Sequence, residues 1–161
     1  MIAIGEPTVC DTHDYRHKHE VSFMKLAKIL TYSGTLPLVA CVALIFSPIV
    51  GVDNHILATT YSAIILSFLC GTHWAIFLFF AEKCSNNLLI TSNLVALLAW
   101  CSLLVTYQEI SFIFQALSFL FLLMLDFRLF NAGVLPDWYY HLRRNATAIV
   151  VVCLAALAVL S

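Results

Sequence analysis

The apolar segment 56–81 constrains the fold of this chain more than any other stretch. Its sequence, ILATTYSAIILSFLCGTHWAIFLFFA, contains no Asp, Glu, Lys or Arg over 26 residues. A helix needs only about 20 residues to cross a bilayer hydrocarbon core of about 30 Å. We therefore predict that segment 56–81 forms a transmembrane helix.

The composition places the rest of the chain in the same class. Hydrophobic residues make up 62% of the 161 positions and charged residues 11%, whereas a typical soluble domain is about 25% charged. A soluble fold of this size could not bury so much apolar surface. We predict an all-α, polytopic transmembrane helix bundle that follows a polar N-terminal tail, residues 1–26. The five transmembrane helices are expected at about 27–47, 56–81, 88–105, 110–125 and 145–160, with a kink near Pro37.

The charged residues predict the orientation and limit the partners. Lys and Arg concentrate on the cytoplasmic side of membrane proteins, and here they lie in or beside the tail, the second connection and the fourth connection. We expect a cytoplasmic N-terminus and a C-terminus outside. The net charge of −1 offers no basic surface for nucleic acid, so the expected partners are membrane lipid and other membrane proteins. The basic residues are Arg16, Lys18, Lys25, Lys28, Lys83, Arg128, Arg143 and Arg144.

Small residues recur every four positions along segment 56–81. They let helix backbones approach closely in lipid, where no hydrophobic drive brings helices together. We predict that this small-residue stripe packs against neighbouring helices. It consists of Thr59, Ala63, Ser67, Gly71 and Ala75.

The same segment carries His73, an ionisable residue at membrane depth. Such a group is costly unless it is paired, and it marks function by default. We name Asp126 as its partner, with Arg128, Arg143 and Tyr32 as competitors. Two interpretations stay open: a structural lock within the bundle, or a cytoplasm-facing cavity that binds a ligand or relays a proton. The full set of polar or ligand-binding candidates is Tyr32, His73, Trp74, Asn93, Asp126, Arg128, Trp138, Tyr139 and Arg143.

The connection 131–144 is rich in aromatic and basic residues, NAGVLPDWYYHLRR. Such a composition is typical of a membrane interface, where aromatic rings lie at headgroup depth and Arg reaches phosphates. We expect Trp138 and Tyr139 among the headgroups, with Arg143 and Arg144 bound to lipid phosphate.

Metal, cofactor and catalytic signals are weak. Cys10, His13 and His17 lie on one face of the tail if it is helical and form a conceivable soft-metal triad, but no fourth ligand is fixed. A second His for haem ligation is missing from the expected helices, and nothing resembles a nucleophile elbow. We therefore predict no metal, no cofactor and no enzyme activity.

Several short motifs resemble a known family. They are Tyr32-Ser33-Gly34 with Pro37, Gly71-x-His73-Trp74, Leu125-Asp126 with Leu129, and Pro136-x-Trp138-Tyr139 with Leu142-Arg143. Together they resemble an uncharacterised small five-helix family of proteobacterial inner membranes, with transmembrane-protein-69-like members in mitochondria. The resemblance implies topology and location rather than an activity. Without a transit segment in the sequence, we expect a multi-pass protein of a bacterial inner membrane rather than of mitochondria.

Three functional hypotheses follow. The first is a non-enzymatic accessory or assembly subunit that packs laterally on membrane partners or on itself. The second is a small transporter or channel with a cytoplasm-facing polar cavity around His73 and Asp126. The third is a redox or quinone-linked membrane subunit, which rests only on His73, Trp74 and the aromatic content.

Overall fold

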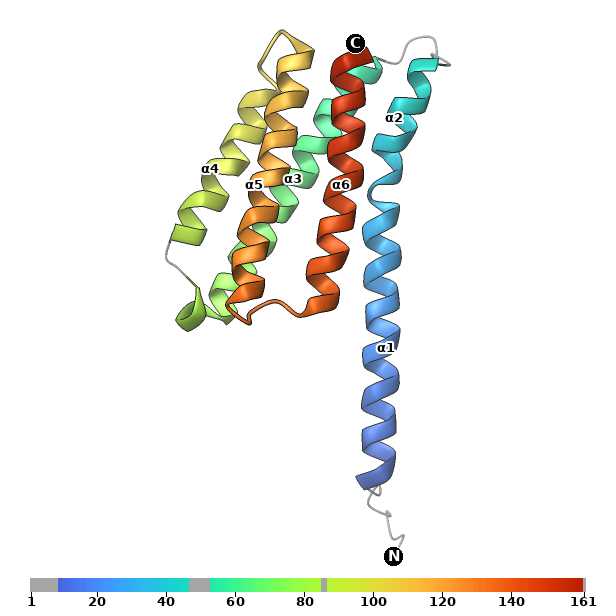
Figure 1. Cartoon of the computed structure of the whole chain (residues 1–161), viewed down its shortest axis with the longest axis vertical. Coiled ribbons are helices and arrows are strands. Elements are labelled where there is room, and N and C mark those ends of the chain that lie inside the picture. The colour runs from blue at the N-terminus through green and yellow to red at the C-terminus, as the bar shows by residue number, and fades with distance from the viewer. Residues whose placement is uncertain (1–8, 47–52, 85–86, 161) are drawn as a thin grey trace, which may run out of the picture. The chain divides into compact units, whose positions relative to one another are not determined.

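The computed structural model describes the backbone of residues 9–46, 53–84 and 87–160, and the side chains of those residues from 21 onward. Within these ranges every regular element is helical, as predicted (Figure 1). The elements are α1 (Val9–Ser33), α2 (Leu36–Phe46), α3 (Asn54–Phe79), the short 3₁₀ helix η1 (Ala81–Lys83), α4 (Asn87–Ser102), α5 (Gln108–Asn131) and α6 (Asp137–Leu160).

The first apolar stretch is interrupted just before Pro37. Helix α1 ends at Ser33 and α2 begins at Leu36, which places Pro37 in the first turn of α2. Its missing N–H is tolerated there because the first turn leaves that donor unused. The chain divides into two compact units at this point, Met1–Gly34 and Thr35–Ser161.

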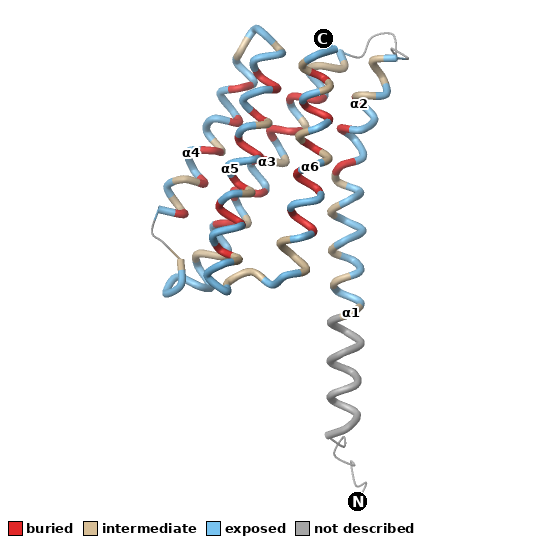
Figure 2. The backbone as a smooth tube through the Cα atoms, in the orientation of Figure 1, coloured by how far each residue is buried: buried red, intermediate tan, exposed pale blue. Residues whose placement is uncertain are grey.

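The second unit is a helix bundle in which α3 packs on α4 and α5 packs on α6. Helix α3 also contacts α5, and α2 lies against α3 and α6. The buried side of each helix faces its neighbours within this unit (Figure 2). Large apolar side chains fill the centre, including Phe112, Phe119, Leu66, Leu122 and Leu154.

Four stretches are long and apolar enough to cross a membrane, and α4 is a shorter apolar helix. Many large apolar side chains also point outward from the bundle, such as Phe79, which is 82% exposed. Outward apolar side chains suit lipid as the surrounding solvent. These features indicate a membrane-inserted helix bundle. The four stretches are Val21–Phe46, Asn54–Phe79, Gln108–Asn131 and Asp137–Leu160.

The predicted connection 131–144 is mostly helix. Helix α5 continues to Asn131, and α6 already begins at Asp137. The Pro136 carbonyl accepts hydrogen bonds from the backbone N–H groups of Tyr139 and Tyr140. Asp137 lies in the first turn of α6, where its negative charge stabilises the helix by interacting with the positive end of the helix dipole. These start signals lie two turns before residue 145, where the uncharged run begins and where the sequence predicted the start of the helix. Arg143 is therefore a helix residue and not, as predicted, a loop residue.

Candidate functional site

Helices α3 and α5 meet along matched seams of buried residues. The buried positions recur every three or four residues on both helices, which is the spacing of a coiled-coil contact. Among the described residues, two hydrogen bonds between side chains join the helices, Ser62 with Gln115 and His73 with Asp126, and both pairs are separated by 53 residues. Because the separation is the same, the two helices run parallel, with a polar layer toward each end of their contact.

One polar layer is ionic and contains the predicted pair. His73 Nε2 lies 2.8 Å from Asp126 Oδ1. Both residues are deeply buried, with exposed fractions of 0% for His73 and 1% for Asp126. The expected partner of His73 is therefore in contact with it, inside α5 rather than after its end.

Helix α6 completes this layer with Arg143. Its Nε donates to Asp126 Oδ2 at 3.0 Å, and its Nη2 lies 2.9 Å from the same oxygen. Arg143 is only 7% exposed, so the expectation that it binds lipid phosphate is wrong. Because α6 begins two turns earlier than predicted, Arg143 faces the bundle while Arg144 is exposed. We call His73, Asp126 and Arg143 the ionic triad.

The charges of the ionic triad compensate one another. Asp126 accepts from both partners, one at each carboxylate oxygen. With Asp126 ionised, Nε2 of His73 acts as the donor, since a carboxylate has no proton to give. The other ring nitrogen, Nδ1, has no hydrogen-bond partner among the side chains and backbone groups that the structure describes. The Asp126 carboxylate and the Arg143 guanidinium carry opposite charges and form an ion pair within the bundle.

The remaining candidates lie apart from the ionic triad or at its edge. The Trp74 Nε1–H donates to Asn93 Oδ1 at 3.2 Å, which joins α3 to α4. Tyr139 interacts with Thr72 and lies near the triad. Its ring meets that of Trp138 edge-on, with centroids 5.7 Å apart. The structure does not bring Arg128 into the cluster, because its side chain is exposed. Tyr32 belongs to the first compact unit.

The small-residue stripe does not form one packing surface within the chain. Thr59 and Ala63 are buried, whereas Ser67, Gly71 and Ala75 are exposed. A four-residue step advances about 40° around a helix of 3.6 residues per turn, so the stripe winds off the buried face. A Cβ atom added at Gly71 would meet nothing within 4 Å. The predicted packing role inside the bundle is therefore wrong for the second half of the stripe.

The second polar layer was missed from the sequence. Gln115 is fully buried; its Nε2 donates to the Thr59 carbonyl at 3.0 Å and to Ser102 Oγ at 2.9 Å. The Ser62 hydroxyl donates to Gln115 Oε1, and the Ser111 hydroxyl donates to the Ser102 carbonyl. We call this set the neutral layer.

A sequence signal for the neutral layer was present. Gln115 is an amide inside an apolar helix, three turns before Asp126. That distance is close to the 11-residue repeat that returns to the same helical face. Reading Gln115 and Asp126 together would have placed both on one face of α5.

The three predicted metal ligands belong to the N-terminal part of α1. The side chains of Cys10, His13 and His17 lie outside the described residues. Among the described residues, no group of three or more His, Cys, Asp and Glu side chains could hold a metal ion.

Comparison with known proteins identifies the family. No curated protein and no solved structure matches the chain. A family model described as "Protein of unknown function (DUF3429)" matches residues 23–159, which include the ionic triad and the neutral layer. The match agrees with the expectation of an uncharacterised family. The chain therefore belongs to the DUF3429 family of proteins of unknown function.

Proposed function

We propose that this chain is a non-enzymatic membrane protein that serves as an accessory or assembly subunit, packing laterally on membrane partners or on itself. The observation that carries the proposal is the ionic triad, whose charged groups are engaged with one another. Asp126 uses one carboxylate oxygen for His73 and the other for Arg143. The triad therefore acts as an internal lock that joins α3, α5 and α6.

The burial of His73 argues against catalysis. A carboxylate that orients an imidazole also occurs in hydrolytic triads, but a catalytic imidazole must reach its substrate. Here the imidazole is 0% exposed, and the second carboxylate oxygen of its partner is occupied by Arg143. These contacts favour a positioning role over proton transfer to a bound substrate.

The distribution of exposed charge supports the proposed orientation. Lys83, Arg128 and Arg144 lie where α3 and α5 end and α6 begins, so they share one end of the second unit. The opposite end carries Asp53 and Glu109 at the starts of α3 and α5. By the positive-inside rule, we place the basic end at the cytoplasm of a bacterial inner membrane, with the C-terminus outside.

The lateral surface for a partner is proposed on the exposed face of α3. This face carries only small side chains at Ser67, Gly71 and Ala75, and the exposed ring of Phe68 lies next to them. Small residues allow a second helix to approach closely. Because they are not used inside the chain, they are free to serve an intermolecular contact.

Purification from native membranes in mild detergent tests this proposal. We expect the wild-type chain to co-purify in stoichiometric amount with another membrane protein or with itself. The matched variant is Gly71→Leu, which adds bulk to the exposed face without a clash inside the chain. It should lose the partner and keep the thermal midpoint. A wild-type chain that is monomeric and alone in native membranes would contradict the proposal.

A second function, proton or ion translocation, is favoured by one specific observation. His73 Nδ1 is buried without a hydrogen-bond partner among the described residues, and intramembrane His residues serve in proton relays. Reconstitution in liposomes with a trapped pH dye tests this alternative. Proton flux that disappears in His73→Gln while the thermal midpoint is kept would favour translocation over the accessory role.

A further inference from the structure

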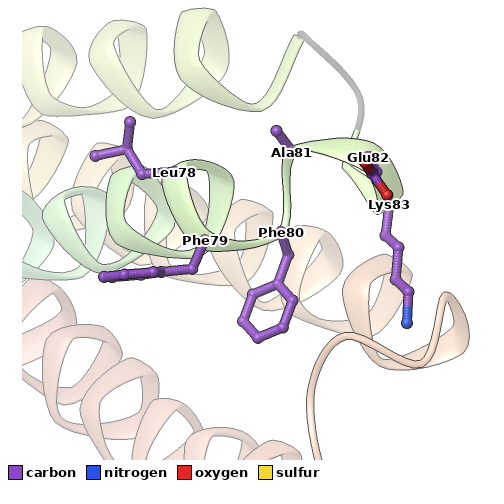
Figure 3. Close-up of a pocket in the computed structure, with 6 residues that line it drawn as sticks. All are labelled: Leu78, Phe79, Phe80, Ala81, Glu82 and Lys83. Atoms are coloured by element: carbon purple, nitrogen blue, oxygen red, sulfur yellow. The ribbon is translucent and has the colours of Figure 1, made fainter.

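The segment 78–83 forms a pocket where α3 ends. Helix α3 finishes at Phe79, and the backbone of Phe80 turns out of the helix before η1 begins. The resulting hollow has a volume of about 270 Å³ (Figure 3). It is lined by Leu78, Phe79, Phe80, Ala81, Glu82 and Lys83.

The lining changes from apolar to charged within a few residues. Leu78 and Phe79 are strongly exposed and Phe80 is about half exposed, so lipid chains can contact all three side chains in a bilayer. Glu82 and Lys83 follow at once, and both are exposed. An apolar wall beside charged groups is the arrangement found where hydrocarbon meets headgroups.

The two charged groups of the pocket are free to bind. No ion pair in the described part of the chain involves Glu82 or Lys83. Lys83 offers an ammonium for a phosphate, and Glu82 offers a carboxylate for a cation. The pair therefore matches a ligand that carries both charges, and the aromatic wall matches its hydrocarbon part.

We propose that this pocket binds a zwitterionic aminophospholipid of the phosphatidylethanolamine class. Lys83 binds the lipid phosphate, Glu82 binds the primary ammonium, and Phe79 and Phe80 contact the start of the acyl chains. The primary ammonium distinguishes this lipid from phosphatidylcholine, because a quaternary ammonium has no N–H to donate to Glu82. The net neutrality of the two side chains distinguishes it from phosphatidylglycerol, which has no cation for Glu82.

The proposal rests on the membrane placement described above but not on the accessory role. A chain without a protein partner would still bind this lipid, and a chain without lipid preference could still bind a partner. The two proposals therefore fail independently.

Native mass spectrometry of the purified full chain tests the site. The protein is mixed with phosphatidylethanolamine, phosphatidylcholine or phosphatidylglycerol of identical acyl chains, and the retained lipid is counted. We expect the highest retention with phosphatidylethanolamine. Lys83→Gln should lower retention of all three lipids, by about fivefold for one basic side chain at a lipid surface. Glu82→Gln should remove the preference for phosphatidylethanolamine and raise retention of phosphatidylglycerol.

The control variant is Arg144→Gln, which removes an exposed cation outside the pocket. Arg144 is expected to contact lipid phosphate whatever the rest of the headgroup, so this variant should lose retention of all three lipids to the same degree and keep the preference for phosphatidylethanolamine. All three substitutions are expected to keep the thermal midpoint because they lie at the surface. Loss of the phosphatidylethanolamine preference in Arg144→Gln, or no preference among headgroups in the wild-type chain, would overturn the proposal. The proposal would also be overturned if inorganic phosphate displaced the lipid at a concentration similar to that of the lipid, because the pocket would then bind a free anion.

Discussion

The ionic triad and the neutral layer are two different kinds of polar contact between the parallel helices α3 and α5. They lie about three turns apart and share the same 53-residue separation. Gln115 reaches a backbone carbonyl and two hydroxyl groups, so its amide is satisfied by several neutral partners. Asp126 depends on single side chains from α3 and α6. Loss of Asp126 or Arg143 leaves a charge unpaired in the triad, whereas loss of a group in the neutral layer leaves only an unpaired dipole.

The largest effect is expected from Asp126→Ala, which removes the carboxylate common to both contacts of the triad. Arg143 would stay buried without a counter-ion, and an unpaired buried charge costs about 3–5 kcal/mol. Unfolding of the reconstituted protein with increasing denaturing detergent measures the loss. A variant as stable as the wild-type chain would show that the triad does not act as a lock.

His73→Ala should cost less, because the Asp126–Arg143 pair remains. A hydrogen bond to a charged group contributes about 1.5–3 kcal/mol, and the same unfolding assay reports it. His73→Gln, which can still donate to Asp126, should recover most of the stability. Equal losses in both variants would show that ring packing, and not the contact with Asp126, accounts for the effect.

Gln115→Leu should have a smaller effect than either change in the triad. It replaces the amide by an apolar side chain of similar volume, and hydrogen bonds between membrane helices contribute about 0.6 kcal/mol on average, with a maximum of about 1.7. A loss larger than that of His73→Ala would reverse the ranking of the two layers. Detergent unfolding of both variants side by side decides the order.

Gly71→Leu should have the smallest effect on the isolated chain, within about 0.5 kcal/mol, as is usual for surface substitutions. The added side chain enters open space around α3. A strong loss of stability in the monomer would mean that this half of the small-residue stripe packs inside the bundle after all. Sedimentation in detergent distinguishes that result from a change in association.

The positions of the apolar runs were largely predictable, because apolar run length sets them and turn residues end them. The predicted start of the first helix at about residue 27 was wrong, because α1 begins at Val9 within the polar tail. Segment 56–81 differs from α3 by only two residues at each end. The ends of α5 and the start of α6 were less predictable. Both helices extend into charged sequence, so a search for uncharged runs stopped short of Asp126 and Arg143. The interrupted first span was anticipated through Pro37, which cannot continue a helix interior without cost.

By itself, the sequence determined that this is an all-helical membrane chain and that His73 needs a buried partner. Lipid cannot hydrogen-bond a bare backbone or solvate an isolated charge, and both requirements are visible in composition. Only the tertiary structure decided that Asp126 is shared with Arg143, that Gln115 forms a second layer, and that half of the small-residue stripe faces outward. Those outcomes depend on helix register and rotation, which arise from the packing of all the helices in the second unit together and not from any one segment.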